Sequence, residues 1–467
     1  MRLLSLVTRP SLRGLVAGSG RIPEHGDFSP IKVAVVDLDE QTGANVGDLA
    51  SSGSYACAWV LVRLHGRPLG ELTVTTTAEP ASDDELGQAI WNRWGSLIDD
   101  HVTEHRSSSG EAGGRPLAGW ESCLGGQRRA TPSVSVVIPT YRRLEGVLRC
   151  VESVLSTGYP DLEILVVDNA PAYPGTAAAL SERFSGDERV RYLTQPVPGA
   201  SRARNKGVAS ARGDVIAFVD DDVVVDRHWL VALIDALDRS PDAACVTGLV
   251  IPDSLDSPEQ FWFEAFGGFN RGYARRTFDL ANDRGDTLLY PYTAGALGAL
   301  NNAAFRRSAL KSPVAFDETL GPGTPAFGAE DQDSFVSLLR AGGRLVYEPS
   351  ALVRHSHRDS YAELRWQIFT YGAGMVAGLL HWAMRDRSVA RELTGRILAA
   401  LPAILRGGSR EAALQSASDA CPPSLRRLER LGHVYGPVAY ARAVRYRRRI
   451  DHQASTSADD ARTRDVM

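Results

Sequence analysis

Two short apolar runs on either side of one amphipathic segment constrain the fold of this chain more than any other feature. Val134–Ile138 and Leu162–Val167 are nearly continuous apolar runs, as expected of strands that are buried on both faces. Between them, apolar residues recur at helical spacing from about Arg143 to Leu155. A strand, a helix and a strand at this spacing predict a right-handed βαβ unit and therefore a parallel sheet. Ligands of such sheets bind beyond the carboxyl ends of the strands. The residues at these two strand ends are Pro139, Thr140, Tyr141, Asp168 and Asn169.

A third buried strand leads directly into three carboxylates. Val215–Val219 is again apolar, and Asp220, Asp221 and Asp222 follow it. Adjacent carboxylates repel one another and cost stability unless a cation neutralises them. A hard divalent ion accepts oxygen ligands and also bridges to phosphate oxygens. An acidic turn that caps the next helix is the alternative, but the position at the mouth of a parallel strand favours a metal and a nucleotide.

These motifs come in an order that resembles the nucleotide-binding half of family-2 glycosyltransferases, which have the GT-A fold. The resemblance rests on Val136–Tyr141, Val166–Asn169, Ala203–Gly207 and the segment from Gly213 to Asp222. It covers roughly half of the chain and depends on several motifs together, since each alone is weak. It implies an α/β fold with a mostly parallel mixed sheet flanked by helices. It also implies metal-dependent inverting transfer of a sugar from a nucleotide diphosphate sugar to an acceptor.

The resemblance assigns a donor-binding role to each matching position. Pro139, Thr140 and Tyr141 with Asp168 would hold the nucleotide base. Arg204 and Asn205, at the start of a predicted helix, would form a second donor contact, and a helix N-terminus with an arginine suits phosphate.

The acidic triplet corresponds to the DXD motif of the family. Asp220, with Asp221 beside it, would contact the ribose or base of the donor. Asp222 would coordinate Mg²⁺ or Mn²⁺ against the diphosphate.

The acceptor half is predicted around a glycine-punctuated loop. Gly321–Pro325 leads to Glu330 and Asp331, and a loop that closes over a carboxylate is suited to excluding water and removing a hydroxyl proton. In inverting family members, a Glu-Asp pair here carries the general base, which implies Asp331 as the base and Glu330 as a residue that shapes the site. Acidic residues at a helix start also oppose the helix dipole favourably, and both roles are compatible.

Two histidines follow at the end of a further predicted strand. His355 and His357 occupy alternate positions and therefore share one face. Several GT-A enzymes use a histidine here as a metal ligand, and we predict His355 rather than His357.

The remaining segments divide the chain into further units. We expect an N-terminal segment (1–30), a small α+β module of open role (31–105), a linker (106–132), the catalytic domain (133–360), a helical basic extension (361–450) and a disordered tail (451–467). In the module, Ile31–Leu38 and Ala56–Leu64 alternate like strands, Arg67–Gly70 is expected to form a turn, and Leu86 to Ile98 has helical spacing.

Composition limits the partners and the compartment. A net charge of -4 gives no global signature of nucleic-acid binding. The five cysteines have no zinc-type spacing, and the absence of a signal-peptide core predicts a cytoplasmic protein. Ile368–Met384 is short and rich in glycine for a membrane span, so we expect a packed helix. The arginines from Arg442 to Arg449 leave open a peripheral contact with the inner face of the plasma membrane.

Three functions from different classes remain open at this point. They are a glycosyltransferase, a non-catalytic nucleotide-sugar-binding protein and a nucleotidyltransferase. Intact Asp222, Asp331 and His355 favour the enzyme, and the segment from Thr247 to Phe269 resembles bacterial single-addition members of the family. The sequence leaves the acceptor open among a cell-envelope glycan, a lipid-linked intermediate and a natural product.

Overall fold

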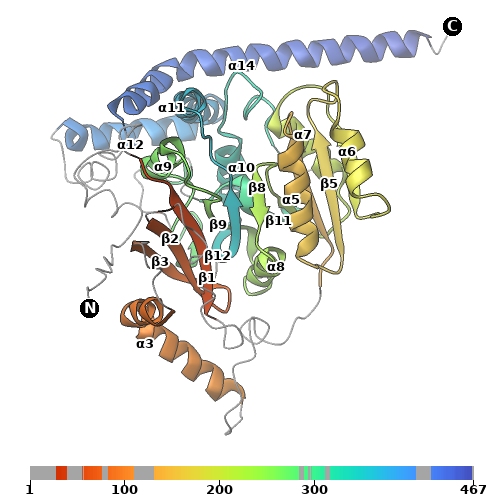
Figure 1. The fold of residues 1–467 in the computed structure, drawn as a ribbon. Coiled ribbons are helices and arrows are strands. Elements are labelled where there is room, and N and C mark those ends of the chain that lie inside the picture. The colour runs from red at the N-terminus through yellow and green to blue at the C-terminus, as the bar shows by residue number, and fades with distance from the viewer. Residues whose placement is uncertain are drawn as a thin grey trace.

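The computed structural model describes residues 28–38, 55, 57–75, 83–109, 131–282, 289–292, 295, 297–310, 316–405 and 422–464 (Figure 1). Most of the expected linker (106–132) and most of the N-terminal segment lie outside these residues, and the first four residues of that linker, 106–109, are helical rather than linker. The described residues form two sheets, one of three strands and one of nine.

The larger sheet contains the strands predicted from the apolar runs. Its order is β10-β12-β9-β11-β7-β4-β5-β6, and β8 pairs with β12. Strands β4, β5, β6 and β7 are mutually parallel, β9 and β12 are parallel, and β8, β10 and β11 run antiparallel to their neighbours. The bounds are β4 (Val134–Thr140), β5 (Leu162–Asp168), β6 (Val190–Thr194), β7 (Val215–Phe218), β8 (Val223–Val225), β9 (Ala243–Pro252), β10 (Arg276–Phe278), β11 (Ala303–Arg306) and β12 (Arg344–His355).

Helices cover both faces of this sheet, which explains why its strands are continuously apolar. Val136 and Ile138 face a core built with α5 (Leu144–Ser156), α6 (Thr176–Arg183) and α8 (Trp229–Asp238). Val137, which points the other way, belongs to a core shared with α7 (Ala200–Ser210) and α10 (Glu330–Arg340). Short 3-10 helices flank β11 at Leu300–Asn302 and Arg307–Ala309. The mixed sheet with helices on both sides confirms the predicted GT-A fold class.

The N-terminal module is a three-stranded sheet with one helix. Its elements are β1 (Ile31–Leu38), β2 (Cys57–Leu64), β3 (Arg67–Thr75) and α3 (Asp83–Ser109). The predicted turn at Arg67–Gly70 is wrong, because these residues are the start of β3. The turn is His65–Gly66, where both residues have positive φ, 50° and 75°; two such residues match the right-handed twist of a hairpin.

The module's sheet is buried on both faces. One face packs against α3, with Val60 and Val62 meeting Ile90 and Trp94. The other face packs on β9, β12 and α9 (Pro258–Phe266) of the larger domain, where Trp59 belongs to a shared apolar cluster. The module therefore covers this face of the larger sheet.

Three helices complete the described chain: α11 (Tyr361–Arg385), α12 (Arg387–Leu405) and α14 (Pro423–Arg464). Helices α11 and α14 approach closely along glycines, since a Cβ on Gly372 or Gly432 would lie 2.3 or 2.2 Å from the opposing backbone. In Figure 1, α14 runs past α11 and continues well beyond it. No helix among the described residues is long and apolar enough to cross a membrane.

The end of α14 differs from the expected disordered tail. The helix continues to Arg464, beyond the predicted boundary at Asp451. Arg447 and Asp451 form an ion pair of 2.9 Å at i,i+4 spacing across that boundary, and such pairs favour continuation of a helix.

Candidate active site

The predicted site residues gather at one edge of the larger sheet. Strands β4, β5, β7 and β12 all end there, because β12 is parallel to β9 and β11 is antiparallel to both β9 and β7. The residues at these ends are Thr140, Asp168, Asp220, Asp221, Asp222 and His355. The parallel order thus brings together side chains that are up to 215 positions apart in the chain.

The three carboxylates of the triplet have different partners. Asp221 turns back to β4, where its Oδ2 accepts hydrogen bonds from Thr140 Oγ1 at 2.8 Å and from Tyr141 N at 3.3 Å. Asp220 Oδ1 pairs with Arg204 Nη2 at 2.8 Å. Asp222 Oδ2 accepts a short hydrogen bond from Arg143. Of the three carboxylates, Asp221 is the one that bonds to Thr140 of β4.

Arg143 is a site residue that sequence reasoning missed. It follows Thr140 by three positions and stands at the N-cap of α5, so its place beside a predicted strand end was the available signal. Arg143 and Arg204 both supply positive charge to the three carboxylates. This corrects the expectation that a metal ion alone must neutralise the triplet. Burial and the neighbouring Asp222 nevertheless raise the pKa of Asp221 to about 7.

Asp222 and His355 face each other across a short gap. Asp222 Oδ1 is 3.4 Å from His355 Nε2, is buried and has no hydrogen-bond partner within the described chain. Burial lowers the pKa of His355 to about 4, so the ring is neutral near pH 7. Burial acts to raise the pKa of Asp222, but His355 and Arg143 hold it below its usual range.

This pair fits a divalent cation. A buried carboxylate oxygen without a partner beside a neutral imidazole nitrogen is a donor set that Mn²⁺ and Mg²⁺ accept. Within the described residues, no group of three or more His, Cys, Asp or Glu side chains is arranged to hold a metal ion. Further ligands would have to come from outside the chain, as from phosphate oxygens or water.

Three of the predicted donor-binding side chains are engaged by the protein itself. Asp168 accepts hydrogen bonds from Ala170 N and Tyr192 Oη, both at 2.8 Å. Asn205 donates to Phe316 O and accepts from Phe316 N, both at 2.9 Å, and so anchors the segment before the acceptor loop. Arg204 is almost completely buried and has carboxylates at two of its nitrogens.

Side chains at the outer end of β4 remain accessible. Pro139 is half-buried within β4, and Tyr141 is 47% exposed. Arg142, which has positive φ, lies over the rings of both Tyr141 and Tyr173 at 5.2 and 5.4 Å. Sequence reasoning did not single out Arg142 and Tyr173, which form an exposed group with Tyr141.

Arg204 connects the triplet with the predicted acceptor carboxylates. Its Nη1 is 3.0 Å from Glu330 Oε1, while its Nη2 holds Asp220. Burial, together with the adjacent Asp331, raises the pKa of Glu330 to about 8. Asp331 is half-buried and its Oδ2 accepts from Leu300 N at 3.0 Å, so its other oxygen remains for a ligand.

The third carboxylate of this segment has a different environment. Asp333 is buried, and its Oδ1 is 3.5 Å from His381 Nε2 on α11. Of the three carboxylates at the start of α10, only Asp331 is therefore not fully buried.

The family-model comparison matches this part of the chain. Residues 135–310 fit the model described as "Glycosyl transferase family 2". Residues 135–310 are therefore a family-2 glycosyltransferase domain. Its matched segment contains the triplet and all predicted donor residues, whereas Glu330, Asp331 and His355 lie beyond it.

Several proteins similar to this chain carry the names of glycosyltransferases. A glucosyl-dolichyl phosphate glucuronosyltransferase of Haloferax volcanii is 28% identical over 247 residues, which are 50% of this chain and 73% of the relative. A pre-mycofactocin glycosyltransferase of Mycobacterium tuberculosis is 31% identical over 227 residues, 48% of this chain but only 43% of the relative. A solved mannosyltransferase from Pyrobaculum calidifontis, in complex with GDP-Man and Mn²⁺, has a TM-score of 0.44 at 17% identity and covers 66% of this chain and 87% of its own.

The loop before Glu330 in the glycosyltransferase domain is firmly packed. Leu320 is fully buried, and its carbonyl accepts from Ser201 Oγ at 2.9 Å. Pro322 O accepts from Ala200 N, also at 2.9 Å. The loop that was expected to close over Asp331 is thus held against the first turn of α7.

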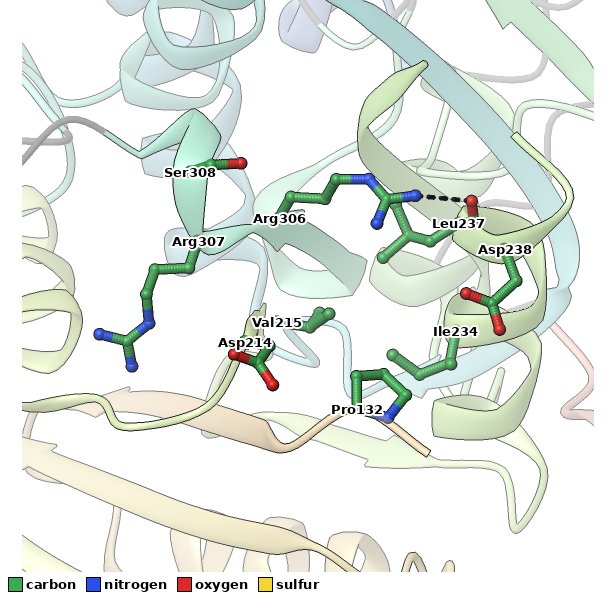
Figure 2. A pocket seen from close by; sticks show the side chains of 9 residues that line it. All are labelled: Pro132, Asp214, Val215, Ile234, Leu237, Asp238, Arg306, Arg307 and Ser308. Carbon is green, nitrogen blue, oxygen red and sulfur yellow. Dashed lines mark hydrogen bonds between the residues drawn. The ribbon is translucent and has the colours of Figure 1, made fainter. Parts of the chain in front are cut away.

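A cavity of about 510 Å³ lies at the opposite end of the domain's sheet. Figure 2 shows it between the start of β7 and α8, with Arg306 and Arg307 above it. Both guanidiniums donate to backbone carbonyls, Arg306 to Leu237 O and Ala243 O, and Arg307 to Gly213 O and Ala211 O. None of the predicted site residues lines this cavity.

Proposed function

We propose that the chain is a metal-dependent inverting glycosyltransferase that moves a sugar from a nucleotide diphosphate sugar to an acceptor hydroxyl. The observation that carries this proposal is the buried, unpartnered Asp222 Oδ1 facing His355 Nε2 at 3.4 Å. The family match supports glycosyl transfer as the reaction class. The unit that performs it would be residues 133–360, with the N-terminal module and the helical extension packed against it.

Donor binding would use residues at the strand ends, of which Tyr141 is exposed and Thr140 is buried. Thr140 and Tyr141, next to Pro139, would position the base, with Asp168 holding the adjacent turn in place. Asp222 and His355 would hold Mg²⁺ or Mn²⁺. When bound, the ion supplies positive charge that stabilises the departing diphosphate. Asp221 fixes the β4 end through Thr140.

Acceptor activation would fall to Asp331. As the acceptor oxygen attacks the anomeric carbon opposite the leaving diphosphate, the carboxylate takes the hydroxyl proton. The partial exposure of Asp331 supports this role. Arg204 would hold Asp220 and Glu330 in fixed positions, and Asn205 would hold the segment that leads to the acceptor loop.

We also propose a peripheral contact of α14 with an anionic membrane at the cytoplasmic face, which would suit a lipid-linked acceptor. Leu431, Val434 and Val438 recur along one side of α14 and are 58%, 77% and 49% exposed. Exposed arginines continue this side at Arg442 and Arg445, and an apolar stripe flanked by arginines suits an anionic lipid surface. The name of the Haloferax volcanii relative includes a dolichyl phosphate-linked sugar.

A donor-hydrolysis assay tests the enzymatic proposal. The full chain is incubated with Mn²⁺ and a panel of nucleotide sugars, and release of nucleotide diphosphate is followed over hours. We expect slow hydrolysis of one donor that stops with EDTA and in Asp222→Ala, because each removes part of the metal site. Binding without hydrolysis would instead indicate a non-catalytic binding protein. In a parallel incubation with a nucleoside triphosphate and a sugar phosphate, release of pyrophosphate would indicate a nucleotidyltransferase.

A further inference from the structure

The structure contains a chain of side-chain contacts behind the predicted metal ligand His355. His355 Nδ1 is 2.9 Å from His357 Nδ1, and His357 Nε2 is 2.6 Å from Glu264 Oε1 on α9. Glu264 and His357 have side chains that are 7% and 1% exposed. Neither residue has a role in the donor or acceptor contacts described above.

These contacts determine where the ring protons lie. An ionised Glu264 only accepts hydrogen bonds, so His357 Nε2 carries a proton and donates a hydrogen bond to Glu264. A neutral His357 then has a free lone pair on Nδ1, which accepts from His355 Nδ1–H. His355 Nε2 is left without a proton, and its lone pair points toward the unpartnered Asp222 Oδ1.

Local packing holds the three residues in this arrangement. The rings of Phe263 and Phe269 lie 4.6 Å from His357 and 4.9 Å from His355, respectively. A Cβ on Gly268 would lie 2.5 Å from a carboxylate oxygen of Glu264, so the backbone there approaches the carboxylate closely. The two histidine rings are thus each packed against a phenylalanine ring, and rotation of either histidine ring would break one of the contacts described above.

We propose that Glu264, acting through His357, is a positioning residue that sets the tautomer of His355 and so prepares Nε2 to bind the divalent ion. Metal-bound histidines commonly donate their second ring N–H to a carboxylate or a carbonyl, which fixes tautomer and orientation. Here a second histidine stands between the ligand and the carboxylate. The inference rests on the proposed function, because it assumes that Asp222 and His355 hold the ion.

The test compares Glu264→Gln with Asp253→Asn in the full chain. Asp253 follows β9, and its side chain contacts Ser356 and Arg149. Its backbone N donates to His355 O at 3.0 Å, a contact that asparagine keeps, so the substitution removes a nearby side-chain charge. Binding of Mn²⁺ is measured by electron paramagnetic resonance with UDP and, separately, GDP. We expect Glu264→Gln to weaken Mn²⁺ binding about 10- to 100-fold, while Asp253→Asn and the thermal midpoints remain close to wild type.

A second readout needs no metal. Nitrogen-15 NMR of histidine-labelled, metal-free protein should show the His355 proton on Nδ1 in wild type and a population shift toward Nε2–H in Glu264→Gln. A wild-type proton on Nε2, or equal Mn²⁺ affinity in wild type and Glu264→Gln, would overturn the inference. An equal loss in Asp253→Asn would also overturn it, since charge alone would then explain the effect. If the wild-type protein fails to bind Mn²⁺ both with UDP and with GDP, the metal assignment of the proposed function fails. The tautomer spectra still test the role of Glu264 separately.

Discussion

At the scale of single residues, the proposed mechanism depends most on Asp331. Asp331→Asn keeps the shape of the side chain but removes its basicity. We expect donor binding to remain nearly unchanged and sugar transfer to slow by about a hundredfold to ten-thousandfold, the usual contribution of a positioned base. Single-turnover transfer rates and calorimetric donor affinities measure the two effects separately.

The neighbouring carboxylates provide matched controls for this prediction. Glu330→Gln should reduce transfer less, because a pKa of about 8 leaves Glu330 mostly protonated at pH 7 and glutamine resembles that form. Asp333→Asn should transfer sugar at nearly the wild-type rate, since Asp333 is buried beside His381. If Asp333→Asn slowed sugar transfer while Asp331→Asn transferred sugar at the wild-type rate, the base would be Asp333.

At the scale of elements, α14 carries an exposed apolar stripe followed by arginines. Arg445 and Arg448 are exposed on it, and an arginine near an anionic surface contributes about 1 kcal/mol. Arg445→Glu with Arg448→Glu should therefore weaken binding to anionic liposomes about thirtyfold or more. Flotation at low salt with phosphatidylserine vesicles measures this.

The flotation experiment has a matched surface control. Arg212 and Arg227 are also exposed but lie outside α14, so reversing both charges should leave flotation unchanged. Replacing Leu431, Val434 and Val438 by serine should reduce it as well, because the apolar stripe is lost. Wild type that stays at the bottom of the gradient at low salt would end the proposal of a membrane contact.

At the scale of the whole molecule, one buried arginine joins the N-terminal module to the glycosyltransferase domain. Arg63 on β2 pairs with Asp226 at 2.8 Å and with Asp37 at 3.1 Å. Arg63→Met leaves these carboxylates without their cation, and we expect the free energy of unfolding at pH 7 to fall by about 3 kcal/mol. Arg183→Met, which removes an exposed pair with Glu152, should change it by less than about 1 kcal/mol.

The same ion pair predicts a pH dependence. Burial acts to raise the pKa of Asp226, but Arg63 holds it below its ordinary value. The unfolded chain therefore binds more protons than the folded one between the lowered pKa and about 4, and this stabilisation is present above that window and lost as the pH falls through it. In urea unfolding from pH 7 to pH 3, the difference between wild type and Arg63→Met should shrink in acid; a constant difference would contradict the assignment.

The sequence alone determined the buried strands β4, β5 and β7, because runs such as Val134–Ile138 are local signals that need no distant partner. It also placed Asp222 and Asp331 at a strand end and a helix start, since such positions follow from local pattern. Its errors were local too: Arg67–Gly70 resembles a turn by composition, but positive φ at His65 and Gly66 decided the hairpin.

Tertiary structure alone decided the partners across the site. Which carboxylate of the triplet meets Arg143, Arg204 or His355 depends on how β4, α7 and β12 pack. The contact of Glu264 with His357 spans 93 positions, and no pattern in the sequence relates α9 to the end of β12. Such pairs form because burial leaves polar groups only the partners that packing brings within hydrogen-bonding distance, and that choice is made by the whole fold.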